Sequence, residues 1–310
     1  MNILITGAYG SGARYLAEYL VDNTNCNVHG LVRWDTKQDS VIQIHECDLT
    51  DLSSVIRVLN KVKPHYIMHM AANAHVYASF NQPLAVMNNN INGTLNLYEA
   101  IRLLELDPMI ILCGTSEIYG DVAPENTPIK ETYPPQPTNP YSVSKLTQEK
   151  IALCYYYCYN VKTIITRAFT YINPRRKDLF SSNFARQIVD IERGKLGVLL
   201  HGNLNSVRAI TDVRDIAEAY WKAAIECDAG EAYNIGSSVP IGVEDVLNLL
   251  IDKARVNIPT ALDKTLLRPK DVTLQVPDIS KFVAKTGWSP KYSIDESIDF
   301  LLAHYRNENG

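Results

Sequence analysis

Two residues at helical spacing, Tyr141 and Lys145, form a candidate proton-transfer pair. Pro140 precedes them, and proline favours an early position in a helix, so the two side chains would share one helix face. An ammonium group beside a phenol favours the phenolate, and the positive end of the helix dipole acts in the same direction. We therefore expect a tyrosine that exchanges a proton near neutral pH, although a free phenol has a pKa of about 10.

A second polar cluster, Thr115, Ser116 and Glu117, follows the apolar run 109–113. In an open α/β sheet, ligands bind beyond the carboxyl ends of the strands, so these side chains would face a ligand. A helix cap or ordinary loop polarity is the alternative interpretation. The chain has 18 tyrosines, so the Tyr141–Lys145 spacing alone is not specific, and this cluster supplies the needed second signal. We predict that Thr115, Ser116, Glu117, Tyr141 and Lys145 belong to one functional site.

The chain opens with a strand-like run, a glycine-rich turn and a helix-like segment at 14–22. This order is typical of a dinucleotide site. Gly7 would make the tight turn, and Gly10 would let the backbone approach a pyrophosphate at the helix N-terminus.

The second predicted strand, 27–32, ends at Arg33 without the acid that usually binds a free ribose hydroxyl. Arginine suits a 2′-phosphate, so NADP(H) is favoured and NAD(H) is the alternative. Small residues after the fourth strand would leave room for a nicotinamide ribose. The predicted cofactor contacts are Gly7, Tyr9, Gly10, Ser11, Gly12, Arg33, Asp48, Leu49, Ala71, Ala72, Tyr141 and Lys145.

Alternating strands and helices would position these residues. Strands are expected at 2–6, 27–32, 41–46, 65–70, 109–113 and 162–167, with helices at 14–22, 51–61, 84–106 and 141–159. Such alternation predicts an α/β fold with a doubly wound parallel sheet. The last third has helices at 181–193, 212–226, 243–253 and 294–305, a strand at 232–235, and irregular segments between them.

We therefore predict a Rossmann domain with a smaller, interleaved C-terminal substrate domain. The NADP(H)-binding part would be 1–168 with about 209–236, and the nucleotide-sugar-binding part 169–208 with 237–310.

Composition narrows the functional class. The chain has 310 residues and a net charge of −4, which predicts no general affinity for nucleic acid or anionic membranes. No apolar run approaches the roughly 20 residues that span a bilayer. Six scattered cysteines without a C-x-x-C pair are expected to be reduced core thiols, and we see no basic leader before the first strand. A cytoplasmic location is expected, with no metal.

These motifs resemble the extended short-chain dehydrogenase/reductase family over almost the whole chain. The chain is most similar to the GDP-mannose 4,6-dehydratases and to the GDP-4-keto-6-deoxy-mannose reductases within that family. The segments that carry this similarity are 75–83, 115–120, 173–176, 202–204, 211–215 and 267–269, with Arg208. Thr170 stands where such families have Asn, and the residues after Arg208 also differ, so the sugar and the base stay open.

The resemblance implies roles for individual residues. Tyr141 would take the proton of the sugar's 4-hydroxyl, Lys145 would hold the cofactor ribose, and Thr115 would bind the oxygen on carbon 4. Glu117 would remove the proton on carbon 5, with Glu117 or Ser116 assisting loss of water. The predicted substrate contacts are His75, from the matched segment 75–83, and Arg176, Arg208 and Arg268, because arginine suits a diphosphate.

Three functions remain open at this point. The first is a GDP-hexose 4,6-dehydratase, the second a nucleotide-sugar reductase or 4-epimerase, and the third a non-catalytic NADP-binding protein. A reductase or epimerase needs no base at carbon 5, so Glu117 separates the first from the second. A homodimer or homotetramer is also expected, because the helices 84–106 and 141–159 carry apolar residues on more than one side.

Overall fold

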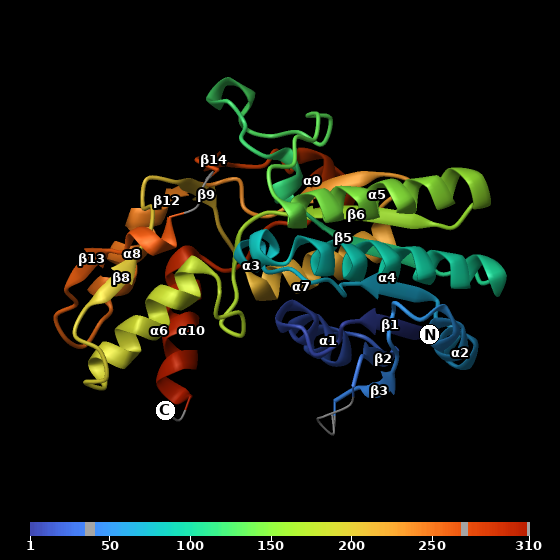
Figure 1. Cartoon of the computed structure of the whole chain (residues 1–310), viewed down its shortest axis with the longest axis horizontal. Coiled ribbons are helices and arrows are strands. Elements are labelled where there is room, and N and C mark those ends of the chain that lie inside the picture. The colour runs from blue at the N-terminus through green and yellow to red at the C-terminus, as the bar shows by residue number, and fades with distance from the viewer. Residues whose placement is uncertain (35–40, 268–271, 309–310) are drawn as a thin grey trace.

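The computed structural model describes residues 1–34, 41–267 and 272–308, and its main feature is a seven-stranded parallel sheet (Figure 1). The strand order is β11-β6-β5-β4-β1-β2-β3. The bounds are β1 Asn2–Thr6, β2 Asn27–Val32, β3 Gln43–Glu46, β4 Tyr66–His69, β5 Met109–Thr115, β6 Thr163–Ala168 and β11 Ala232–Ile235. The predicted doubly wound parallel sheet is confirmed, and the strand predicted at 232–235 forms its edge beside β6.

Helices cover both faces of the sheet. Ile3 and Ile5 of β1 face one core, and Leu4 faces another. The first core is closed by α1 (Ser11–Asn23) and α7 (Val213–Glu226), and the second by α2 (Leu52–Val62), α4 (Pro83–Leu103) and α5 (Pro140–Tyr159). Because both faces are buried, the strands are apolar along most of their length, as the sequence indicated.

A second region lies beside the sheet, at the left of Figure 1. It is built on α6 (Phe180–Glu192), α8 (Val243–Asp252) and α10 (Ile294–Asn307), which share a third core. Three small sheets accompany these helices: β8 (Leu199–His201) with β13 (Thr260–Leu262); β12 (Pro240–Gly242) with β9 (Val207–Ala209) and β14 (Leu274–Gln275); and β7 (Tyr171–Ile172) with β10 (Thr211–Asp212).

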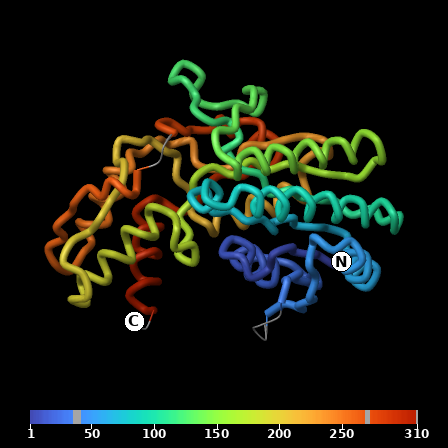
Figure 2. Tube along the Cα trace, viewed as in Figure 1, coloured from blue at the N-terminus to red at the C-terminus, as the bar shows by residue number. Residues whose placement is uncertain are grey.

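Several short elements lie outside the predicted ones. They are α3 (Val76–Asn81), α9 (Ser280–Thr286) and the 3₁₀ turns Ser116–Tyr119, Pro124–Asn126 and Lys264–Leu266. One or two helical turns give too few residues for a helical period to be recognised. The predicted helix 84–106 ends at Leu103, and Glu105 beyond it has a left-handed backbone (φ 52°). The tube in Figure 2 shows the chain between β5 and α5, in green, projecting from the body of the molecule.

The cysteines differ in part from expectation. Cys47, Cys113 and Cys227 are buried, but Cys154 and Cys158 are exposed on α5, so the expected core position is wrong for these two. Within residues 1–34, 41–267 and 272–308, no helix has the length and apolar character that crossing a bilayer requires.

Candidate active site

A cavity of about 320 Å³ opens beyond the carboxyl ends of β5 and β6, between the large sheet and the second region. Its size suits a small-molecule ligand. Residues from segments far apart in the chain meet on its wall. The predicted site residues that line it are His75, Thr115, Ser116, Glu117, Tyr141, Arg176 and Arg208.

The 3₁₀ turn after β5 presents the polar cluster to this cavity. Thr115 caps the turn, because its Oγ1 accepts a hydrogen bond from the Glu117 backbone N–H at 3.3 Å. The Ser116 hydroxyl donates to Gln275 Oε1 at 3.3 Å, and Gln275 Nε2 donates to the Ser116 carbonyl at 3.3 Å. Gln275 of β14 was not predicted, since it lies in a segment without a periodic pattern and 159 residues from Ser116.

Glu117 is held toward the start of α5. Its carboxylate accepts a hydrogen bond from Asn139 Nδ2 at 3.0 Å. Asn139 is also the N-cap of α5, and its Oδ1 accepts from the Ser142 N–H at 2.8 Å. One amide side chain therefore fixes both the carboxylate and the first turn of the helix that carries Tyr141. The contact between Asn139 and Glu117 was not predicted, because the two residues lie 22 positions apart in the chain.

Tyr141 is buried, and Thr115 beside its phenol favours the phenolate and so acts to lower the pKa of Tyr141. Burial raises the pKa of Tyr141 to about 12, and the positive charge of Arg176 offsets part of that increase. The phenol is therefore protonated at neutral pH.

We expected the ammonium of Lys145 to lower the pKa of Tyr141, and the structure shows that this expectation is wrong. Burial lowers the pKa of Lys145 to about 8, and its Nζ donates to the Cys113 carbonyl at 2.6 Å. The desolvation of a buried phenolate outweighs the favourable effects expected from the helix and the lysine. The two side chains share the predicted helix, but Lys145 is directed to the strand β5.

The glycine-rich turn fits a dinucleotide. Gly7 has a φ of 67°, and a Cβ atom there would lie 2.9 Å from the Ala71 Cα, so only glycine is accommodated. Gly10 is the N-cap of α1 and, as a glycine, provides no side chain to cap that first turn. The first backbone N–H groups of α1, including those of Ser11 and Gly12, are thus suited to a pyrophosphate.

The predicted cofactor contacts Arg33 and Asp48 meet at the ends of β2 and β3. Arg33 Nε lies 3.5 Å from Asp48 Oδ2, and Arg33 Nη2 donates to Asn89 Oδ1 at 2.7 Å. The Arg33 side chain is 44% exposed, so a ligand can reach it. Leu49 lies nearby against Gly93 of α4.

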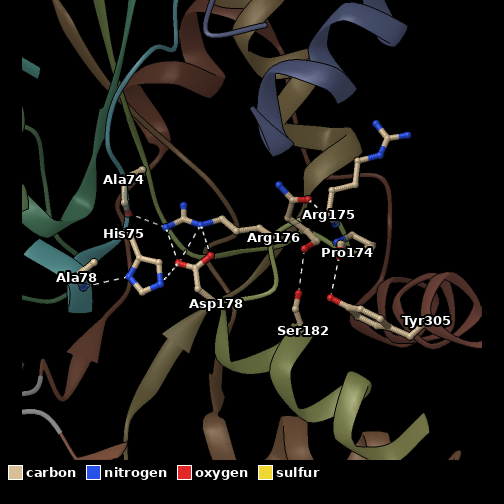
Figure 3. A network of polar contacts seen from close by, with 10 residues as sticks. Ala74, His75, Ala78, Pro174, Arg175, Arg176, Asp178, Ser182 and Tyr305 are labelled. Carbon is tan, nitrogen blue, oxygen red and sulfur yellow. Dashed lines mark hydrogen bonds and ion pairs between the residues drawn. The ribbon is translucent and has the colours of Figure 1, made fainter. Parts of the chain in front are cut away.

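Arg176 and His75 belong to a polar network that joins the two sides of the cavity (Figure 3). Arg176 Nη2 donates to the Ala74 carbonyl at 2.7 Å, and its Nε donates to Asp178 Oδ1 at 3.1 Å. His75 Nε2 lies 3.9 Å from Asp178 Oδ2. The charge of Arg176 therefore acts close to Tyr141.

The other two predicted arginines are placed differently. Arg208 lines the cavity, and its guanidinium donates to the carbonyls of Val207 and Val272 at 2.9 and 2.6 Å. Arg268 lies outside the described residues.

Comparisons with known proteins agree with this arrangement. The family model described as GDP-mannose 4,6 dehydratase matches residues 4–300. A GDP-mannose 4,6-dehydratase from Vibrio cholerae is 29% identical, and the match covers 94% of this chain and 90% of that protein. A GDP-6-deoxy-D-mannose reductase from Pseudomonas aeruginosa is 28% identical, with 79% and 81% covered. The solved structure of RMD from Pseudomonas aeruginosa complexed with NADPH superposes with a TM-score of 0.89, at 25% identity and 99% coverage of both chains.

Proposed function

Because the chain belongs to the GDP-mannose 4,6-dehydratase family, we propose that it is a 4,6-dehydratase of a GDP-linked, mannose-like sugar. This family membership confirms the resemblance predicted from the motifs at 115–120 and 141–145. One observation carries the proposed activity. Glu117 lines the same cavity as Tyr141, close enough for its charge to act on the phenol, and Asn139 orients its carboxylate.

The proposed reaction assigns each cavity side chain a step. Tyr141 accepts the proton of the 4-hydroxyl, and Thr115, which lies beside that phenol, also binds the oxygen on carbon 4. The resulting ketone acidifies the proton on carbon 5, which Glu117 removes. Glu117 or Ser116 then assists departure of the 6-hydroxyl as water, and carbon 5 regains a proton as hydride is added at carbon 6.

The cofactor proposed is NADP(H), with NAD(H) as the alternative, held by the turn at Gly7 and Gly10 and by Lys145. When bound, the cofactor would supply the acceptor for hydride from carbon 4 and the donor of hydride to carbon 6, and the positive charge of its oxidised form would favour the Tyr141 phenolate. No external reductant is consumed over a full cycle.

The two regions are proposed to divide the binding. Residues 1–168 with about 209–236 would bind the cofactor, and 169–208 with 237–310 would bind the nucleotide sugar. The cavity between the sheet and the second region supports this division. Phe282 and Trp288 nevertheless pack into the core beside β1, so part of the later segment supports the cofactor side. We also propose that the protein acts in the cytoplasm.

A reductase of a 4-keto-6-deoxy sugar is the second candidate. The similarity to the Pseudomonas aeruginosa reductase favours it, and so does Tyr141, because a protonated phenol is suited to give a proton to a ketone oxygen. Mass spectrometry of the products from GDP-, UDP-, dTDP- and CDP-linked sugars, with and without added NADPH, tests the assignment. Loss of water without added NADPH supports the dehydratase, and strict dependence on NADPH overturns it.

The cofactor preference gives the first prediction. Arg33→Ala should weaken NADP(H) binding roughly tenfold to a hundredfold, because a charged hydrogen bond to the 2′-phosphate contributes about 1.5–3 kcal/mol. NAD(H), which lacks that phosphate, should be affected little. Calorimetry with both cofactors measures the difference, and Arg57→Ala is the matched control, since Arg57 donates to the Glu46 carbonyl near the end of β3. Equal losses for both cofactors would refute the role of Arg33.

The substrate diphosphate gives the second prediction. Arg208→Met should raise the Michaelis constant for the nucleotide sugar by roughly tenfold or more and leave cofactor affinity unchanged, because a charge-assisted contact to phosphate is lost. Steady-state kinetics and cofactor titration give the two values. A crystal structure with a bound GDP-sugar far from the Arg208 guanidinium would remove this residue from the site.

The oligomeric state gives the third prediction. We propose a homodimer or homotetramer through α4 and α5, which pack together and expose apolar side chains: Leu84 is 73% exposed, Leu95 39% and Tyr157 74%. Light scattering at micromolar concentration should give at least twice the monomer mass of 34.8 kDa. A monomer under these conditions contradicts the proposal.

A further inference from the structure

Two elements carry all five side chains proposed for catalysis. Helix α5 holds Tyr141 and Lys145, and the segment from Thr115 into the 3₁₀ turn Ser116–Tyr119 holds the rest. Proton transfers at carbons 4 and 5 of one sugar ring require these elements to keep a fixed spacing, since small misplacements are costly to rate. A contact that holds the 3₁₀ turn against α5 therefore affects how accurately the catalytic side chains are positioned.

Arg167 of β6 makes such a connection. Its Nη2 donates to Glu149 Oε2 at 2.9 Å and its Nε to Glu149 Oε1 at 3.2 Å. Its Nη1 donates to the Tyr119 hydroxyl at 2.9 Å and to the Glu131 carbonyl at 2.9 Å. Glu149 stands four residues after Lys145 on α5, and Tyr119 stands two residues after Glu117. One guanidinium thus bonds to both catalytic elements.

The side chains that form this connection are buried, so they have little freedom to move. Arg167 is 8% exposed, Glu149 1% and Tyr119 0%. The Tyr119 hydroxyl donates onward to Asn234 Oδ1 of β11 at 2.7 Å. A Cβ atom on Gly114 would lie 2.8 Å from the Thr166 carbonyl and 3.1 Å from Glu149 Oε1, so the backbone before Thr115 is already in close contact with the ion pair.

We infer that Arg167 is a positioning residue, which sets the spacing between Tyr141 and Glu117 through Glu149 on one side and Tyr119 on the other. Buried ion pairs of this kind add little net stability compared with apolar side chains of similar volume, but their directional bonds fix geometry. The inference rests on the proposed function, because it takes Tyr141 and Glu117 as the groups to be spaced.

The mildest test removes one hydroxyl. Tyr119→Phe keeps the ring and takes away the bond from Arg167 to the 3₁₀ turn. Tyr98→Phe is the matched control: Tyr98 is also 0% exposed, and its hydroxyl bonds to Thr163 at the first residue of β6, away from the cavity. Both variants lose one buried hydroxyl group. Tyr119→Phe breaks two hydrogen bonds and Tyr98→Phe breaks one, so the melting temperature is measured for both variants to show the structural cost of each change.

The readouts are the rate of solvent-deuterium exchange at carbon 5, the rate of the first hydride transfer, the melting temperature and the affinity for GDP. Tyr119→Phe should slow exchange at carbon 5 by about tenfold to a hundredfold, because the turn that carries Glu117 loses its hydrogen bond to Arg167. The first hydride transfer should be slowed less. Tyr98→Phe should match the wild type in both rates. Equal effects of the two variants on the rates would overturn the inference.

A second variant distinguishes an effect on the position of the catalytic side chains from an effect on the stability of the fold. Glu149→Leu with Arg167→Met replaces the ion pair with apolar side chains and leaves no unpaired charge. It should fold with a melting temperature near that of the wild type and show the same selective loss as Tyr119→Phe. Wild-type rates in this double variant would refute the positioning role.

The product formed by the wild type decides the proposed function separately. If that product is the product of a reductase, Tyr119→Phe should still slow hydride transfer relative to Tyr98→Phe, because Thr115 and Tyr141 must both reach the oxygen on carbon 4.

Discussion

Replacing Glu117 with Gln is expected to slow elimination of water by roughly 10²–10⁴-fold, the usual contribution of a general base. The amide keeps the shape of the side chain and a hydrogen bond to Asn139, but it cannot take the proton from carbon 5. The first hydride transfer should survive, because Tyr141 and Thr115 are untouched. Single-turnover spectroscopy should therefore show reduced-nicotinamide absorbance that builds up and persists, and exchange of the carbon 5 proton with heavy water should fall in parallel.

The same variant also separates the two candidate enzymes. In a reductase, Glu117→Gln should change hydride transfer from NADPH to a 4-keto sugar very little, since no proton leaves carbon 5. A Glu117→Gln protein that dehydrates at the wild-type rate would end the dehydratase assignment and favour the reductase.

Tyr141→Phe is expected to lower turnover by roughly 10²–10⁴-fold in either enzyme, because the group that exchanges the proton at the 4-oxygen is lost. In contrast to Glu117→Gln, no reduced cofactor should accumulate and exchange at carbon 5 should disappear, since no ketone forms. Affinities for GDP and for the cofactor, measured by calorimetry, should stay near wild type and serve as the control for folding. Unchanged turnover would show that another group carries the proton.

Lys145 and Tyr141 contribute to the pH dependence of the wild type. The pKa of Lys145 is lowered to about 8, so its ammonium form decreases as the pH rises above that value. Tyr141, with its pKa raised to about 12, stays protonated across the neutral range until positive charge is bound beside it. Helical spacing predicted a lowered pKa for Tyr141, and that direction is wrong, because the extent of burial depends on tertiary packing that the spacing does not specify.

Much of the sheet was predictable from the sequence, because strands buried on both faces are short apolar runs and the helices between them are long. The strands 2–6, 27–32 and 232–235 have the predicted bounds. The helices α3 and α9 were missed, because they have only six and seven residues.

The candidate site was predictable to the extent that its residues lie in local motifs. Thr115, Ser116, Glu117 and Tyr141 meet in one cavity because the carboxyl end of β5 and the start of α5 lie together. Their partners come from distant segments: Gln275 lies 159 residues from Ser116 and bonds it across the cavity. Contacts of this kind depend on chain topology and leave no short-range pattern. The catalytic and binding roles of the site residues stay predictions.

The central claim is that hydride leaves carbon 4 and returns to carbon 6 of the same sugar. GDP-mannose labelled with deuterium at carbon 4, incubated without added NADPH, tests it most directly. The dehydratase should give a 4-keto-6-deoxy product with the deuterium at carbon 6, located by mass spectrometry and nuclear magnetic resonance. Deuterium that stays at carbon 4, in the starting sugar or its 4-epimer, or a protein that turns over only a 4-keto sugar with added NADPH, would contradict it.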